Sequence, residues 1–201
     1  MIRAVIFDWG GVLMRTVDAS PRLAWDARLG LVPGNVNRLV FESYAWRRAQ
    51  LGQMRDGDFW VNLGARLNLS PDALTEFRRD FWAGDRLDGD LVALIRSLRP
   101  RYKTALLSNF SAQLSQLLTQ HGLIDVLDVI VISGEEGILK PDARIYHLAA
   151  GRLGVPVADC LFVDDVEENV AGARAAGMQA LHFVSFPSVV LGLSSELGVA
   201  L

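Results

Sequence analysis

The stretch of the chain that most constrains its fold is residues 3–13, RAVIFDWGGVL, in which an apolar run ends in an aspartate and two glycines. Residues 4–7 are apolar, and three of them are β-branched or aromatic. They do not alternate with polar residues, which is typical of a strand buried on both faces. A carboxylate at the end of such a strand is costly to bury alone, so Asp8 must reach a cleft or meet a cation. Gly10 and Gly11 allow a sharp turn directly after it.

The second half of the chain alternates between helical and short apolar segments. Residues 88–98, 111–121, 142–153 and 167–176 have helical patterns, and the apolar runs are residues 102–107, 129–132, 160–163 and 179–184. This alternation is typical of a parallel sheet with helices on both faces. Together with the first strand, it predicts an α/β fold with a doubly wound, Rossmann-like core. Residues 187–201 have an apolar helical pattern suited to covering the sheet or to a dimer contact.

Between these parts lies a stretch with helical patterns and no predicted strand. Its helices are expected at residues 20–29, 36–51, 58–67 and 71–83, and four of the five tryptophans lie among them. Ser20 with Pro21, and Ser70 with Pro71, are typical helix starts. We therefore expect a small helical bundle inserted into the core. Three arginines are candidates to reach a phosphate or carboxylate from this region, namely Arg15, Arg47 and Arg48.

Charge and composition exclude some classes of function. The net charge of −3 and the lack of a basic run disfavour nucleic-acid binding. No apolar stretch approaches membrane-spanning length, and no secretory signal precedes the first strand. The single cysteine, Cys160, excludes an intramolecular disulfide. We expect a soluble cytoplasmic protein that binds neither nucleic acid nor membrane, and its oligomeric state, monomer or homodimer, is left open.

Polar residues follow three of the predicted strands at their carboxyl ends. In open α/β sheets this edge is where ligands bind. Three clustered carboxylates repel one another unless a cation is present, and Mg²⁺ is the hard ion that leaves room for a substrate phosphate. The sequence thus predicts a magnesium and phosphate site with Asp8 as nucleophile and Ser108 as a phosphate-binding group. The residues gathered there are Asp8, Ser108, Asn109, Asp164 and Asp165, with Lys140 arriving from a loop.

Four segments of the chain resemble, in order, the motifs of the haloacid dehalogenase superfamily. They are FDWGGVL, LLSN, the lysine of GILKPDARIY, and VDDVEEN. The chain is similar to phosphatase-like members with a helical cap, which implies a core at residues 1–14 and 86–201 and a cap at residues 15–85. The resemblance implies a hydrolase acting on a small phosphorylated metabolite with Mg²⁺ as cofactor.

The resemblance also implies a role for each motif residue. Asp8 would form an aspartyl-phosphate, while Ser108 and Lys140, with Asn109, would hold the phosphoryl group. Asp8, the Gly10 carbonyl and Asp165 would bind the metal. Asp164 would be a second ligand or a partner behind the ligands, and Asn169 would support the fourth motif.

Gly10 departs from the phosphatase pattern, because relatives usually carry an aspartate there that protonates the leaving group. General acid or base help of this kind is worth roughly a hundredfold to ten-thousandfold in rate. Three readings remain open: a phosphatase that uses another acid or a good leaving group, a catalytically weak or inactive member that binds a phosphorylated ligand or a protein, and a dehalogenase-type hydrolase. Members of the last type usually carry a tyrosine at this position and lack the paired aspartates.

Overall fold

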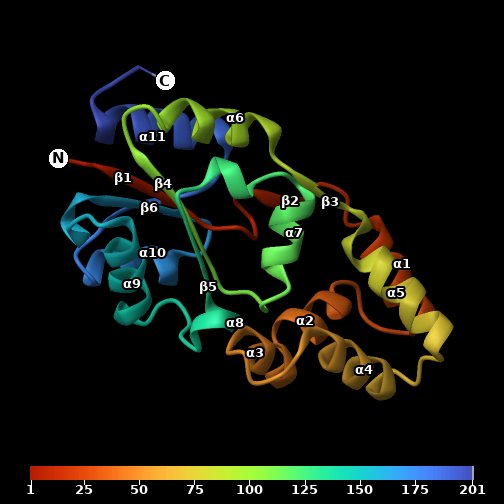
Figure 1. The fold of residues 1–201 in the computed structure, drawn as a ribbon. Coiled ribbons are helices and arrows are strands. Elements are labelled where there is room, and N and C mark those ends of the chain that lie inside the picture. The colour runs from red at the N-terminus through yellow and green to blue at the C-terminus, as the bar shows by residue number, and fades with distance from the viewer. Residues whose placement is uncertain (201) are drawn as a thin grey trace.

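Five parallel strands form the central sheet of the protein, whose computed structural model describes residues 1–200 (Figure 1). Their order is β5-β4-β1-β6-β7, so the first strand lies in the middle. The sheet confirms the predicted doubly wound α/β core. The strands are β1 (Ala4–Phe7), β4 (Lys103–Ser108), β5 (Val129–Ile132), β6 (Cys160–Asp164) and β7 (Gln179–His182).

Helices cover both faces of this sheet because alternate strand residues point to opposite sides. Val5 and Phe7 of β1 pack in one apolar cluster with α6, α7 and α11. Ala4 and Ile6 pack in the other, with α9 and α10. The helices are α6 (Gly89–Leu98), α7 (Leu114–Gln120), α8 (Ser133–Glu136), α9 (Ala143–Leu153), α10 (Glu167–Ala175) and α11 (Phe186–Leu197), with the 3₁₀ turns η1 (Ile124–Val126) and η2 (Val157–Asp159).

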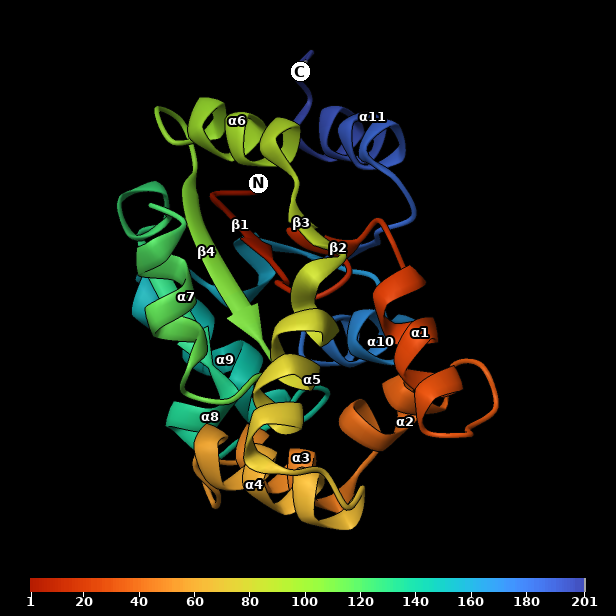
Figure 2. The same ribbon diagram turned by 90° about the vertical axis from the view of Figure 1, so that its right-hand side faces the viewer.

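A separate group of helices extends from one side of the core (Figure 2). It contains five helices within the described residues, where the sequence predicted four, because the helix expected at residues 36–51 is broken. Ser43 accepts a hydrogen bond from the Trp46 backbone N–H and so begins a new helix. The helices are α1 (Ser20–Arg28), α2 (Asn35–Phe41), α3 (Tyr44–Gln50), α4 (Asp56–Arg66) and α5 (Pro71–Ala83).

The two predicted serine caps have different outcomes. Ser70 accepts a hydrogen bond from the Ala73 backbone N–H and begins α5 as predicted. The Ser20 prediction is wrong, because the cap position is Ala19 and Ser20 lies within the helix. Instead, Asp18 accepts a hydrogen bond from the Ser20 N–H.

A two-stranded ribbon that the sequence did not predict joins the helical group to the core. Strands β2 (Met14–Thr16) and β3 (Asp85–Leu87) pair antiparallel. Beside them, a Cβ on Gly84 would lie 1.8 Å from the Asp18 carbonyl oxygen, so only glycine fits there. We propose the division into a core of residues 1–14 and 86–201 and a cap of residues 15–85, because the chain passes between the two parts at this ribbon.

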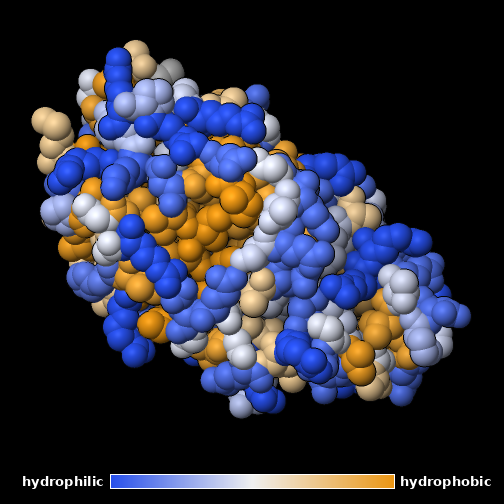
Figure 3. Space-filling view, viewed as in Figure 1, coloured by the Kyte–Doolittle hydropathy of each residue, from blue (hydrophilic) through white to orange (hydrophobic). Residues whose placement is uncertain are grey.

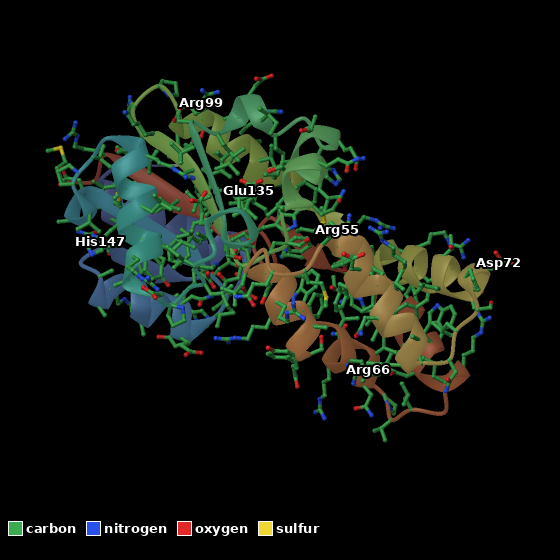
Figure 4. All side chains as sticks on the ribbon, turned by 60° about the horizontal axis from the view of Figure 1, so that its bottom comes forward. Arg55, Arg66, Asp72, Arg99, Glu135 and His147 are labelled. Atoms are coloured by element: carbon green, nitrogen blue, oxygen red, sulfur yellow. The ribbon has the colours of Figure 1, made fainter. Side chains whose placement is uncertain are left out.

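The surface of the core carries an exposed apolar area, and charged residues lie on the surfaces of both parts (Figure 3 and Figure 4). Figure 3 shows an apolar area on the core between α6 and α9, bordered by polar residues. Figure 4 places Arg66 and Asp72 on the cap and Arg99 and His147 on the core. Among residues 1–200, no helix combines the length and apolar character needed to span a bilayer.

Candidate active site

The polar residues predicted at the strand ends lie together where the cap meets the core. Because β1 lies between β4 and β6, Asp8 lies between Ser108 at the end of β4 and Asp164 at the end of β6. The Asp8 backbone N–H donates to the Val163 carbonyl at 2.9 Å, which fixes the start of the loop after β1. Asp8, Ser108 and Asp164 are buried, whereas Asp165 is half-buried.

Lys140 supplies the buried positive charge of the site. Its Nζ lies 2.6 Å from Asp164 Oδ2 and 2.8 Å from Asp8 Oδ1, and it donates to the Leu107 carbonyl at 3.1 Å. The contact with Asp8 is a buried ion pair. Lys140 therefore holds two carboxylates that could not be buried side by side without a cation.

The backbone of Lys140 is held by Asn109. The Asn109 side-chain amide donates to the Lys140 carbonyl at 2.9 Å and accepts from the Lys140 N–H at 2.8 Å. These two bonds connect the loop after β4 to the loop that carries the lysine. In the structure this side chain positions Lys140, and the phosphate contact expected of Asn109 stays a prediction.

Asp164 is held by the loop and helix that follow it. Its Oδ1 accepts from the Val166 N–H at 2.8 Å, and the Asn169 side chain donates to both of its oxygens at 3.2 and 3.1 Å. The Tyr146 hydroxyl donates to the Asn169 carbonyl at 2.8 Å. Asn169 thus contacts Asp164 directly, and its supporting role stays a prediction.

Burial and the close charges alter the acidities of the site. Burial raises the pKa of Asp8 to about 7, although the neighbouring Lys140 ammonium acts in the opposite direction. Burial disfavours the Lys140 ammonium, but Asp8 and Asp164 outweigh it and raise the pKa of the lysine. Burial, followed by the charge of Asp164, also raises the pKa of Asp165. Lys140 is therefore charged near neutral pH. A proton competes with any bound cation for Asp8 and for Asp165, because the pKa of each is raised.

The carboxylates of this site fit a divalent cation. One oxygen from each of Asp8, Asp164 and Asp165 lies within 4.8 Å of the others. When all three are ionised, Lys140 offsets only one of their three charges and leaves two negative charges. Oxygen ligands with this net charge suit Mg²⁺.

Gly11 is what allows Asp165 to approach this cluster. Its φ is +78°, and a Cβ at this position would lie 2.0 Å from Asp165 Oδ2. A side chain at residue 11 would therefore displace the aspartate as well as strain the backbone.

A cavity of about 850 Å³ opens above the carboxylates and extends under the cap. Trp9, which directly follows Asp8, lines this cavity. Arg15 and Arg47 also line it, and Arg15 is paired with Asp88. A phosphate ester of moderate size fits a cavity of this volume.

Sequence reasoning missed two residues that support the site. Tyr146 was taken only as part of a helix, although its hydroxyl holds Asn169. Gln50 of the cap donates to the Asn109 carbonyl at 2.9 Å and so connects the cap to the site. Both contacts join residues far apart in sequence, and no local pattern marks either of them.

Comparison with known proteins gives one family model, described as haloacid dehalogenase-like hydrolase, which matches residues 2–177. The sesquiterpene phosphatase astK of Aspergillus oryzae is 28% identical, with 98% of this chain and 97% of the relative aligned. Phosphatase MT3486 of Mycobacterium tuberculosis is 32% identical, with 89% of this chain and 86% of the relative aligned.

A solved structure with the same fold carries both a metal and a phosphate. It is a haloacid dehalogenase family enzyme of Bacteroides thetaiotaomicron in complex with magnesium and inorganic phosphate. The TM-score is 0.78 at 16% identity, over 94% of this chain and 99% of that one. At this identity the likeness extends to the fold.

Proposed function

This chain belongs to the haloacid dehalogenase-like hydrolases, and we propose that it is a magnesium-dependent phosphatase that cleaves a small phosphate monoester through Asp8. The observation that carries this proposal is the cluster of Asp8, Asp164 and Asp165 around the buried Lys140 at the base of one large cavity. Such a cluster combines a nucleophile, a cation site and a fixed positive charge. These are the groups that phosphoryl transfer requires.

The reaction has two chemical steps. The Asp8 carboxylate attacks the phosphorus of the ester, the bond from phosphorus to the alcohol oxygen breaks, and an aspartyl-phosphate forms. With Gly10 in place of an acid, the departing alcohol takes its proton from water or from another group. Water then attacks the phosphorus, which releases inorganic phosphate and restores Asp8.

The other residues of the site hold the reacting groups. Lys140 and Ser108 hold the phosphoryl oxygens, and Asn109 and Asp164 fix Lys140. Asp8, the Gly10 carbonyl and Asp165 would hold Mg²⁺, which would offset the negative charge of phosphate and carboxylates. Asp164 already accepts hydrogen bonds from three groups, so we place it behind the ligands.

Magnesium binding is expected to strengthen as the pH rises to about 7 and to level off above it. The raised pKa of Asp8 means that the metal-free folded protein binds a proton more tightly than the unfolded chain. The contribution of Asp8 to the free energy of unfolding therefore falls as the pH rises from the usual pKa of an aspartate, 3.8, through about 7. Mg²⁺ needs the ionised carboxylate, so it should raise Tm more at about pH 8 than at about pH 5.5. An equal shift at the two pH values in thermal denaturation would contradict this.

Gly10→Asp is expected to accelerate cleavage of esters whose leaving group needs a proton. A Cβ at Gly10 has no atom within 4 Å, so the cavity accommodates the new side chain. In single-turnover assays, alkyl phosphate cleavage should rise by about a hundredfold, the lower end of general-acid effects, and p-nitrophenyl phosphate cleavage by much less.

The matched control is Gly57→Asp, at an exposed glycine of α4 that is equally free of contacts. It should leave both rates unchanged. If Gly10→Asp accelerates neither ester, another group already donates the proton.

Two alternative functions predict different experimental results. A member that only binds a phosphorylated ligand or a protein would bind phosphate without cleaving any ester. A dehalogenase-type hydrolase would release halide from a haloacid, and its water would attack the Asp8 carbonyl carbon. The paired Asp164 and Asp165 favour the phosphatase over the dehalogenase-type hydrolase, since halide release needs no cation to offset a phosphoryl group.

A further inference from the structure

Four aromatic side chains form a closed ring on the wall of the active-site cavity. Phe41, Trp46 and Trp82 come from the cap, and Phe110 follows β4 of the core. Ring centroids are 6.0 Å apart for Phe41 and Trp46, and 5.2 Å apart for Trp46 and Phe110. They are 6.1 Å apart for Trp82 and Phe110, and 6.0 Å apart for Phe41 and Trp82. The ring, residues 41, 46, 82 and 110, thus spans the cap and the core.

Phe41 is more open than the other three members of the ring. Phe41 is 40% exposed, although it lies at the end of α2 next to buried neighbours. Its exposed surface belongs to the cavity lining. An apolar ligand that covered this surface would remove it from water.

The main cap cation near the ring is fully used by the protein. The Arg22 Nε donates to the Phe81 carbonyl at 2.7 Å. One terminal nitrogen donates to Thr16 and Asn37, both at 3.1 Å, and the other donates to both oxygens of Asp85 at 2.8 Å. All five N–H groups of the guanidinium therefore have partners, and none remains for a substrate hydroxyl.

Several charged groups of the cap wall are already held by the protein. One terminal nitrogen of Arg15 is paired with Asp88, although its buried Nε has no hydrogen-bond partner, and the Gln50 amide donates to the Asn109 carbonyl. Within residues 1–200, Arg47 is the cavity-lining cation without an ion pair, and it is exposed. Each hydroxyl of a polar leaving group would lose water against a wall that also carries four aromatic side chains, which is costly unless the hydroxyl gains a new partner.

On the basis of the phosphatase function proposed above, we propose that the substrate is a phosphate monoester of an apolar alcohol, whose hydrocarbon part packs on the aromatic ring. The phosphate lies at Asp8 and Lys140, and the chain lies under the cap. A second cavity of about 480 Å³ shares Trp9, Trp82 and Phe110 with the first.

A series of straight-chain alkyl phosphates from ethyl to octyl, with glycerol 3-phosphate as the polar ester, tests this proposal. All are used with Mg²⁺ and below the concentrations at which they aggregate. A fully buried methylene group is worth about fourfold in affinity, and a half-buried one about twofold. We expect kcat/KM to rise about twofold per methylene, hence about sixtyfold from ethyl to octyl phosphate, with glycerol 3-phosphate near the ethyl ester.

Phe41→Ala tests the ring directly, and Tyr44→Ala is its matched control. Tyr44 is an aromatic residue of the same part of the cap, 77% exposed and outside the cavity lining. Phe41→Ala should lower kcat/KM for octyl phosphate by about tenfold and for ethyl phosphate by less than twofold, and Tyr44→Ala should change neither.

The wild-type series alone can overturn the proposal. Equal kcat/KM for all chain lengths, or preference for glycerol 3-phosphate, contradicts an apolar substrate while the phosphatase function stands. If no ester is cleaved, including the short ones, the phosphatase function fails and the proposal fails with it.

Discussion

Replacing Asp8 by asparagine is expected to reduce magnesium-dependent phosphate release by about 10⁴-fold or more, the scale on which removal of a catalytic nucleophile acts. The amide has nearly the same shape but is a far weaker nucleophile than the carboxylate. It also removes one negative charge from the metal site. Phosphate release from octyl phosphate and p-nitrophenyl phosphate measures the effect.

The control for this variant is Asp90→Asn. Asp90 is an exposed carboxylate in the first turn of α6, distant from the cavity lining. It should retain wild-type turnover. Residual activity of Asp8→Asn above about one hundredth of the wild type would mean that another residue attacks the phosphorus.

Lys140→Met is expected to lower the free energy of unfolding by about 3–5 kcal/mol and to abolish turnover. Breaking a buried ion pair by removing one partner leaves the other charge uncompensated. Here the loss leaves Asp8 and Asp164 facing each other at the end of the sheet. The destabilisation should be larger at about pH 8 than at about pH 6, because protonation relieves the repulsion at the lower pH.

The matched control is Lys103→Met, since Lys103 is the other lysine of the chain. It is exposed and donates to the Leu153 carbonyl at 2.6 Å. Denaturant unfolding of the two variants should differ by several kcal/mol. Equal stabilities would show that Lys140 does not offset the buried carboxylates.

The residues of the candidate site could be predicted because each follows a strand of a parallel sheet. Carboxyl ends of parallel strands meet at one edge, so Asp8, Ser108 and Asp164 could be placed together before their distances were known. The short, continuous apolar runs also indicated the strands, because such runs are typical of strands that are buried on both faces. Lys140 was placed by its loop position and by resemblance.

The cap could be predicted only in outline. The break between α2 and α3 depends on Ser43 capping a new helix within a continuous helical pattern. The ribbon of β2 and β3 pairs residues some seventy positions apart, and each strand is too short for a pattern. The aromatic ring depends on four residues from four segments, which only tertiary packing brings together.

The most direct test of the account is to isolate the intermediate on Asp8. The enzyme is mixed with ester and Mg²⁺ in a single turnover, stopped with acid, digested with pepsin at acidic pH, where an acyl phosphate persists, and analysed by mass spectrometry. Asp8 is the single acidic residue among residues 1–17, so it is the carboxylate that a peptide from this stretch reports on. We predict that this peptide transiently gains one phosphoryl group, and that it does not in Asp8→Asn. Phosphate release with the peptide unmodified throughout would contradict the aspartyl-phosphate route.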